Sequence, residues 1–358
     1  MMAEQGQSSY DRYSRQMRFT PIGTAGQQLL AKSHVLIVGA GALGSASAES
    51  LVRAGVGHIT IIDRDYVEWS NLQRQQLYTE EDVRERMPKA IAAKRHLERI
   101  NADVQIDAHV LDARGEDLER LVQGVDLLVD ACDNFETRFI LNDIASKHRI
   151  PWIYGACTGS YGISYTILPG ETPCLSCIMD IIPGNGESCD VDGIIAPAVQ
   201  MVVAHQTAEA FKLLTGNYAA LHRKLVSFDL WNHHYAAIQI QTMKKPECAS
   251  CGVHATYPYL HAPSTEKAAI LCGRDTVHIR PSEVMSLDLR SISECIQQNH
   301  TPQHQVDITN EFLLSAHVDR LRIVLFADGR ALVHGTTDLA AARQLCKQLI
   351  DLNPVPTR

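Results

Sequence analysis

Four cysteines form two Cys-x-x-Cys pairs, Cys174 with Cys177 and Cys248 with Cys251. Each pair is short enough to place two thiolates on one ion, and together they supply the four ligands of a closed tetrahedral zinc site. A closed site keeps no position for a substrate, so we expect this Zn²⁺ to join distant segments and to do no chemistry. The alternatives are two redox-active dithiols or a chance spacing, and four matched cysteines favour zinc.

Three glycines follow the apolar run His34–Val38 with the spacing of a dinucleotide-binding fingerprint: Gly39, Gly41 and Gly44. Such glycines permit a tight turn and let backbone N–H groups and a helix N-terminus approach phosphates. Asp63 ends the next apolar run, where a carboxylate can accept hydrogen bonds from ribose hydroxyls. These residues alone suit a nicotinamide-dependent oxidoreductase as well as any other nucleotide site.

Cations and a carboxylate near the same sheet edge favour a polyphosphate substrate over hydride transfer. Arg74 follows the second strand, Lys89 opens the next helix and Arg15 lies in the N-terminal segment. Asp133 follows the fourth strand, at the carboxyl edge where ligands bind in open α/β sheets, and can bind Mg²⁺. Fixed cations and a metal would neutralise the repulsion between a carboxylate nucleophile and ATP. Taken singly, each residue has another reading: Lys89 could be an exposed helix start, Arg74 a solvated loop charge and Asp133 a helix N-cap.

Alternating strands and helices must position these residues. Apolar runs predict strands at 34–38, 58–62, 104–110, 126–131, 153–168 with a bend at 159–162, 224–230 and 235–242. Helices are predicted from the glycines to about residue 54 and at 88–100, 116–123 and 198–215, with a long loop at 183–193. This order implies an α/β protein with a doubly wound, Rossmann-like, mostly parallel sheet that continues into antiparallel strands.

We predict four parts of the chain: an N-terminal helical arm (1–32), a nucleotide-binding domain with a structural zinc site (33–252), a linker (253–267) and a small α+β domain (268–358). In the last part, Asp328-Gly329 predicts a hairpin turn. The segment at Cys272 lacks the six-residue anion-binding loop of a rhodanese, and the sequence gives this part no chemistry.

Composition limits the class of protein. The chain has 358 residues, 45% hydrophobic content and a net charge of −8, which suits one large core or two unequal ones. The acidic balance argues against sequence-independent nucleic-acid binding. Ten cysteines suit a reducing cytosol, and neither a membrane-length apolar run nor a signal-peptide core is present in the sequence. We therefore expect a cytoplasmic protein with no nucleic-acid or membrane partner.

The Cys-x-x-Cys pairs share the chain with six further motifs: Tyr13-Ser-Arg-Gln16, Gly39-Ala-Gly-Ala-Leu-Gly44, Asp63-Arg-Asp65, Ser70-Asn-Leu-Gln-Arg-Gln75, Pro88-Lys89 and Cys132-Asp-Asn134. In combination they resemble the ThiF/MoeB/HesA adenylyltransferases, the bacterial relatives of ubiquitin-activating enzymes. The resemblance spans roughly residues 10–252. It implies that ATP adenylates the C-terminal glycine of a ubiquitin-like sulfur-carrier protein ending in Gly-Gly, with release of pyrophosphate.

The resemblance does not fix the pathway. We expect a ThiS-like carrier, for thiamine thiazole synthesis, because Cys189 is present in a suitable loop, and the alternative is a MoaD-like carrier, for molybdopterin synthesis. A cysteine desulfurase is a further expected partner. Two alternatives come from other classes. An NAD-dependent oxidoreductase would leave Arg74, Lys89 and the zinc site unexplained, and a non-catalytic scaffold for a ubiquitin-like partner would make Asp133 and Arg74 superfluous.

The resemblance also implies roles for single residues. It places Gly41 and Ala42 at the phosphates and Asp63 at the ribose, and it gives Asp133 the Mg²⁺. Triphosphate contacts come from Asn71, Arg74 and Lys89. The same motifs supply the other expected nucleotide-binding residues: Gly39, Gly44, Asp65, Ser70 and Asn134. Ala42 departs from the glycine of many members, but alanine keeps the backbone N–H.

Two further residues join Arg74, Lys89 and Asp133 in the expected catalytic set. Arg15 is similar to the family's N-terminal arginine, which reaches into the partner subunit's site, and so a homodimer is implied. Cys189 matches the loop cysteine that takes sulfur or links to the carrier in ThiF-like members. An inert loop thiol is the alternative for Cys189.

Overall fold

A computed structural model describes residues 11–182, 193–262, 266–270, 275–298 and 304–353. The chain divides into two compact units, Met1–Ala262 and Pro263–Arg358. No helix in the described ranges is long and apolar enough to cross a bilayer.

The first unit contains one eight-stranded sheet in the order β3-β2-β1-β4-β5-β6-β7-β8. Strands β3 to β5 of this order are parallel, and β6, β7 and β8 continue the sheet in antiparallel pairings. The strands are β1 (His34–Val38), β2 (His58–Asp63), β3 (Gln105–Val110), β4 (Leu127–Asp130), β5 (Trp152–Thr158), β6 (Tyr161–Ile167), β7 (Leu225–Asp229) and β8 (His234–Ile238). This arrangement confirms the predicted fold class.

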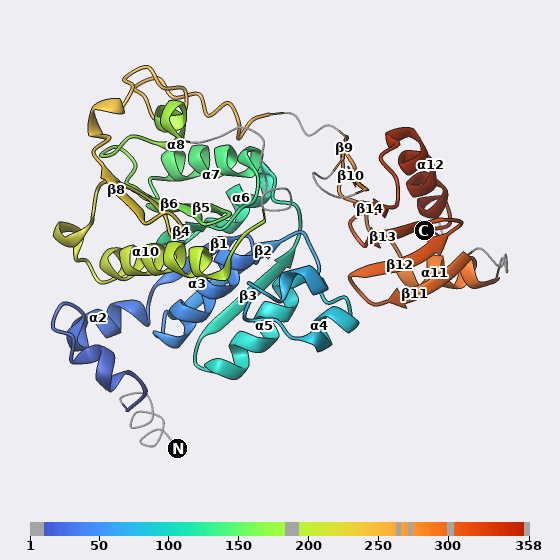
Figure 1. The fold of residues 1–358 in the computed structure, drawn as a ribbon, viewed down its shortest axis with the longest axis horizontal. Helices are drawn as coiled ribbons and strands as arrows, with labels where there is room; N and C mark the ends of the chain where they lie inside the picture. The colour runs from blue at the N-terminus through green and yellow to red at the C-terminus, as the bar shows by residue number, and fades with distance from the viewer. Residues whose placement is uncertain (1–10, 183–192, 263–265, 271–274, 299–303, 354–358) are drawn as a thin grey trace. The chain divides into compact units, whose positions relative to one another are not determined.

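Helices cover both faces of the sheet, which is why the apolar runs of β1 and β4 are buried throughout most of their length (Figure 1). One face packs against helices α2 (Gly23–Leu30), α3 (Ala42–Arg53), α5 (Lys89–Ile100) and α10 (Ala196–Leu214). The opposite face packs against α6 (Gly115–Leu121), α7 (Phe135–His148) and α8 (Leu175–Ile178). The short helix α4 (Glu80–Arg84) precedes α5. Hydrophobic cores on both faces therefore fix the sheet between them.

Helix α7 is the longest element that the sequence patterns did not predict. Its buried residues include polar ones, Arg138, Asn142 and Asp143, beside apolar ones such as Leu141 and Ile144. Polar residues at buried positions hide the amphipathic period that identifies a helix in sequence. The structure begins α7 directly after Asn134 and ends it at His148, before β5.

The second unit is a six-stranded antiparallel sheet in the order β11-β12-β13-β14-β10-β9, with α11 (Leu289–Gln298) and α12 (Leu339–Ile350). The strands are β9 (Lys267–Ile270), β10 (Thr276–Arg280), β11 (His304–Thr309), β12 (Leu313–Val318), β13 (Leu321–Phe326) and β14 (Ala331–His334). The Asp328-Gly329 turn joins β13 to β14, with Gly329 at φ +86°. This unit has its own core, formed by both helices and one sheet face.

The segment after the second cysteine pair packs on the first unit. The backbone N–H groups of Tyr259 and Leu260 donate to the Asp143 carboxylate at 2.8 and 3.3 Å. The Tyr259 ring stacks on Phe139 with centroids 4.5 Å apart. The first compact unit therefore continues past the second cysteine pair, to Ala262.

Candidate functional site

Two glycines of the fingerprint are required by the protein's own packing. Gly39 adopts φ +101°, and a Cβ there would lie 2.3 Å from the Ala131 carbonyl oxygen. A Cβ on Gly44 would lie 1.8 Å from the Gly39 carbonyl oxygen. Glycine is therefore needed to bring α3 against β1 and β4, at the point where the strand order changes direction.

Gly41 differs because the protein's own packing leaves room for a Cβ there. A Cβ on Gly41 would meet only the Gln75 amide nitrogen, at 3.8 Å. Gly41 is also the N-cap of α3, which has no side-chain cap and starts at Ala42. The first N–H groups of a helix have no acceptor within the helix and attract anions. The open space and the uncapped helix end fit a phosphate group.

Gln75 is a buried amide beside this loop. It is 3% exposed, and its Oε1 has no hydrogen-bond partner among the described residues. A buried acceptor without a donor is costly unless a ligand supplies one. The sequence motif contains Gln75, but sequence reasoning gave it no role. Its neighbour Gly41 makes it a candidate contact for the nucleotide.

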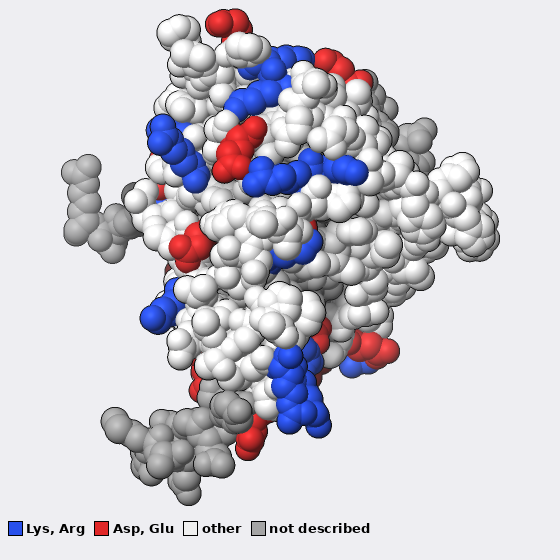
Figure 2. Space-filling view, turned by 90° about the vertical axis from the view of Figure 1, so that its left-hand side faces the viewer, with Lys and Arg blue, Asp and Glu red and all other residues white. Residues whose placement is uncertain are grey.

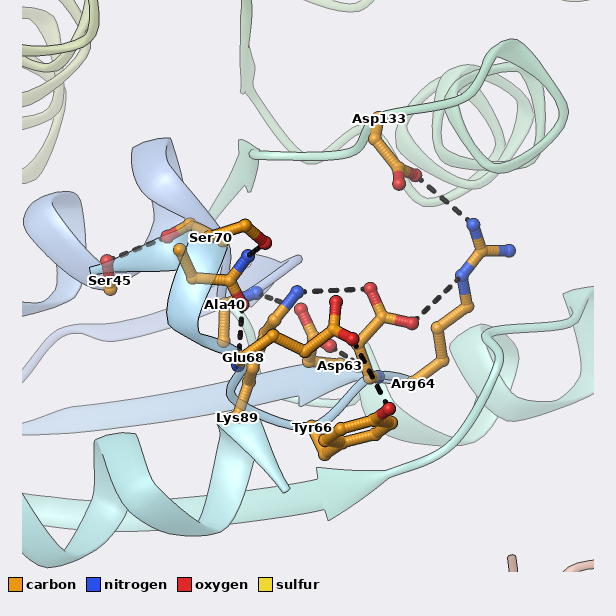
Figure 3. A network of polar contacts seen from close by, with 12 residues as sticks. Ala40, Ser45, Asp63, Arg64, Tyr66, Glu68, Ser70, Lys89 and Asp133 are labelled. Atoms are coloured by element: carbon orange, nitrogen blue, oxygen red, sulfur yellow. Dashed lines mark hydrogen bonds and ion pairs between the residues drawn. The ribbon is translucent and has the colours of Figure 1, made fainter. Parts of the chain in front are cut away.

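Asp63 and Asp65 flank a buried ammonium group at the end of β2 (Figure 3). Asp63 accepts from the Ala40 and Asp65 backbone N–H groups at 2.6 and 2.7 Å, and Lys89 Nζ lies 3.1 Å from Asp65 Oδ2. Burial raises the pKa of Asp63 to about 6, although Lys89 opposes this shift. Burial alone would lower the pKa of Lys89, but Asp65 and Asp63 raise it above its ordinary value. Lys89 thus stays charged where it can meet a phosphate.

Arg64 connects the ends of three strands. Its guanidinium lies 3.4 Å from Asp133 Oδ1, 3.4 Å from Asp112 Oδ1 and 3.9 Å from Asp65 Oδ1. Figure 3 shows the Arg64 side chain reaching from the end of β2 to Asp133, across the carboxyl edge of the sheet. Sequence reasoning assigned Arg64 no function. Its position between Asp63 and Asp65 was the available signal, because a cation between two acids at a strand end is placed to bridge carboxylates.

Asp133 is held by the start of α7. Asn134 caps this helix by accepting from the Thr137 N–H at 2.9 Å, and its amide group donates to Asp133 Oδ1 at 3.0 Å. Buried Arg138 fixes the same loop through the Asp130 carboxylate at 3.1 Å and the Cys132 carbonyl at 2.6 Å. The loop is rigidly held, while the Asp133 side chain remains exposed.

The remaining predicted triphosphate contacts lie in the turn around 3₁₀ helix η1 (Trp69–Asn71). Arg74 is half-buried and donates to the Ser70 carbonyl at 2.9 Å. Buried Asn71 accepts from the Glu68 N–H at 3.1 Å, whereas Ser70 is exposed. Asn71 therefore holds the turn that presents Arg74, and Arg74 is free to exchange a backbone acceptor for a ligand.

Arg15 lies apart from this group of residues. It is exposed in a helical segment at 11–17, whose neighbouring side chains bond to the far ends of α3 and α5. Gln16 donates to the Ala54 carbonyl at 3.0 Å, and Asn101 donates to the Tyr13 hydroxyl at 2.8 Å. The glycine loop is at the other end of α3, about 18 Å away for a helix of 12 residues. Cys189 lies outside the described residues.

The four predicted metal ligands come together. The thiols of Cys174, Cys177, Cys248 and Cys251 all lie within 4.8 Å of one another. Three of the sulfur–sulfur distances are 3.8, 3.7 and 3.6 Å. A regular tetrahedron with Zn–S bonds of about 2.3 Å requires sulfurs about 3.8 Å apart. The spacing fits one tetrahedral Zn²⁺ and is too long for a disulfide.

Charge does not gather into a basic stripe on the face shown in Figure 2. Lys and Arg side chains there are scattered among acidic and uncharged ones.

Comparison with known proteins gives a consistent result. Residues 13–250 match the model of the ThiF family. The chain is 49% identical over 334 residues to a Bacillus subtilis protein named sulfur carrier protein ThiS adenylyltransferase, covering 93% of this chain and 97% of that protein. It is 36% identical to a Thermus thermophilus sulfur carrier protein adenylyltransferase, over 69% of this chain and 92% of the relative.

A third relative and a solved structure extend the comparison. The Haloferax volcanii SAMP-activating enzyme E1 is 34% identical over 68% of this chain and 88% of its own length. The fold resembles Escherichia coli MccB solved with ATP, with a TM-score of 0.59, 23% identity and coverage of 67% of this chain and 74% of MccB. At that identity MccB supports the fold alone. Only the Bacillus protein, among these four, is matched over a length that must include part of the second unit.

Proposed function

Because the chain belongs to the ThiF family, we propose that it adenylates the C-terminal glycine of a ThiS-like sulfur-carrier protein, using ATP and releasing pyrophosphate. The observation that supports this most strongly is the 49% identity to the Bacillus subtilis ThiS adenylyltransferase over 97% of that protein. The open, cation-lined sheet edge agrees with it, since a nicotinamide enzyme has no need of Lys89 and Arg74 at this position.

ATP would lie across the change in strand order, as ligands do in doubly wound sheets. Its phosphates would approach Gly41, Ala42 and the uncapped start of α3. Its ribose hydroxyls would donate to the Asp63 carboxylate. Asn71, Arg74 and Lys89 would contact the triphosphate from the η1 turn and the start of α5. The other predicted nucleotide-binding residues would shape the site around these contacts: Gly39, Gly44, Asp65, Ser70 and Asn134.

Mg²⁺ fits beside Asp133. This carboxylate is exposed, and Mg²⁺ prefers one or two carboxylates together with waters and substrate phosphates. When bound, Mg²⁺ would neutralise phosphate charge. Lys89 and Arg74 would neutralise the rest, so that the carrier's carboxylate can approach.

The reaction is an in-line substitution at the α-phosphorus. A carboxylate oxygen of the carrier's last glycine forms a bond to that phosphorus. The bond from phosphorus to the bridging oxygen breaks, and pyrophosphate leaves with the electron pair. Lys89 is placed to stabilise the charge that develops on the phosphate oxygens. No proton transfer is needed, which agrees with the lack of an assigned general base.

We propose a homodimer in which Arg15 serves the partner's site. Within one chain, Arg15 is at the wrong end of α3 to reach Asp133. The chain that follows Arg15 exposes the apolar side chains of Phe19 and Leu29, and Asn217, next to exposed Tyr218, donates to the Pro21 carbonyl at 2.8 Å. An apolar surface beside the arm supports a second copy as its partner.

The remaining predictions also belong to this proposal. Zn²⁺ would hold the two cysteine pairs together without a catalytic role. The enzyme would work in the cytoplasm, and a cysteine desulfurase would supply sulfur. Cys189 would anchor sulfur or the carrier after adenylation. Accordingly, Cys189→Ala should keep adenylation and lower the yield of carrier thiocarboxylate in the full pathway. An unchanged yield would make Cys189 a passive loop residue.

The test is exchange of labelled pyrophosphate into ATP. We expect exchange with a ThiS-like carrier and none with the same carrier lacking its last glycine. A MoaD-like carrier in a parallel reaction tests the molybdopterin alternative. Exchange with MoaD alone would move the enzyme to that pathway. Exchange with neither carrier would contradict the proposed function.

A further inference from the structure

Arg64 is a cation of the site that contacts the proposed metal ligand, Asp133, directly. Its guanidinium lies 3.4 Å from Asp133 Oδ1, and the same oxygen accepts from Asn134 at 3.0 Å. The Asp133 side chain is 71% exposed and the Arg64 side chain 25% exposed. Arg64 thus covers part of a carboxylate that solvent, and a hydrated metal ion, can still reach.

Arg64 keeps its charge, as arginines do in proteins, and has other partners. The Asp112 side chain is only 6% exposed, at 3.4 Å from the guanidinium. If Arg64 lost Asp133, Asp112 and Asp65 would still neutralise it. The exchange would therefore cost only one exposed ion pair.

We infer that Arg64 competes with Mg²⁺ for Asp133: it neutralises this carboxylate in the empty enzyme and gives it up when the metal–nucleotide complex binds. The inference rests on the proposed function, in which Asp133 is the metal ligand. Arg64 is then a positioning residue. It holds Asp133 in place while the site is empty and weakens the dependence of nucleotide affinity on metal.

The measurement is the affinity of α,β-methylene-ATP, which cannot release pyrophosphate. Calorimetry in Mg²⁺ and in EDTA gives two dissociation constants. The dissociation constant in EDTA divided by that in Mg²⁺ reports how strongly the metal assists binding. Arg64→Gln should raise this ratio about two- to fivefold, the range for one partly exposed ion pair. Arg120→Gln is the matched control, because it removes an exposed arginine that pairs with Asp117 on α6 instead.

Asp133→Asn makes the test specific. This variant should lower the ratio, and Arg64→Gln should have no further effect in its background. If Arg64→Gln leaves the ratio unchanged or lowers it while Asp133→Asn lowers it, the competition is wrong and the proposed function stands. An equal rise with and without Asp133 would also overturn the competition. If Asp133→Asn itself changes nothing, the metal-ligand assignment fails, and the inference fails with it.

Arg64→Gln removes one cationic partner of buried Asp112 and so lowers the stability of this edge. The double variant Arg64→Gln, Asp112→Asn removes the Asp112 charge as well, and we expect the same rise in the ratio from it. Thermal melting shows whether the single or the double variant is folded at the temperature of the calorimetry, and the folded one is used for the affinity measurement.

Discussion

Two regions bring together polar side chains from distant segments. One is the cluster of four cysteines, and the other, here called the nucleotide edge, is the group around Gly41, Asp63, Gln75, Lys89 and Asp133. Only the cysteine cluster is closed. Its thiols face one another, and Ser176 and Ser250, inside the two pairs, bond to each other at 3.1 Å. Ser176 also accepts from Asn142 of α7 at 3.2 Å. One tetrahedral ion would complete this group and leave no room for a substrate.

The nucleotide edge is incomplete by comparison. Asp133 is exposed, the space at Gly41 is open, and the Gln75 Oε1 lacks a donor among the described residues. Asp63 is held as a buried carboxylate, which costs stability. Groups that satisfy one another stabilise the fold, whereas groups left open can bind a ligand. Substitutions in the cysteine cluster should therefore leave nucleotide binding nearly intact, and substitutions at the nucleotide edge should leave the stability of the fold nearly intact.

The largest effect on catalysis should come from Asp133→Ala. Losing the metal ligand leaves phosphate charge unneutralised in the transition state, and carrier-dependent pyrophosphate exchange should fall by ~10²–10³-fold or more. The melting temperature should barely change, because the side chain is exposed. Asp103→Ala, an exposed carboxylate before β3, is the control. Activity within a few-fold of wild type would remove Asp133 from the metal site.

The opposite pattern is expected for Cys248→Ser. Loss of a structural zinc ligand should lower the melting temperature by about 10 °C or more. Nucleotide affinity should stay within a few-fold wherever the protein remains folded. Elemental analysis should find one zinc per chain in wild type, with Cys295→Ser as a control that keeps it. Metal-free wild-type protein, freshly purified without chelator, would end the zinc assignment.

Mixing two inactive variants tests the composite site. Arg15→Ala and Asp133→Ala should each be inactive alone. After subunit exchange, half of the dimers are mixed, and each mixed dimer has one complete site, so about a quarter of wild-type activity should return. Zero recovery despite proven exchange would place Arg15 outside the partner's site.

The smallest effect concerns the pKa of Asp63, raised by burial from 3.8 to about 6. This carboxyl favours the fold when protonated, so its contribution to stability is present below about pH 4 and is lost as pH rises through about 6. Nucleotide affinity should change in the other sense, falling about three- to tenfold below pH 6 as the ribose acceptor is protonated. Asp63→Asn should bind more weakly and lack this pH-dependent step. Identical pH profiles for the two proteins would remove Asp63 from the ribose contact.

Sequence predicted the features that depend on short spacing. The apolar runs of β1, β2 and β4 identified the parallel sheet, and the cysteine pairs identified the cluster now found within 4.8 Å. Both follow from local rules: strands buried on both faces are continuously apolar, and two-residue spacing suits a shared ion.

Features that depend on three-dimensional neighbours were not predictable in this way. Helix α7 was missed because Arg138 and Asn142 are buried for reasons visible only in space, in contact with Asp130 and Ser176. Arg64 gained its importance from Asp112 and Asp133, which arrive from other strands. Gln75 could be quoted in a motif, but its lack of a donor is a property of the folded chain.

The most direct test of the central claim is the mass of the carrier after incubation with the enzyme, ATP and Mg²⁺. The account predicts that an intact ThiS-like carrier gains one AMP on its C-terminal glycine. It predicts no gain with Asp133→Ala, and an undiminished gain with Cys189→Ala. A carrier that never acquires AMP, in the presence of folded, zinc-loaded enzyme, would contradict the proposed adenylation.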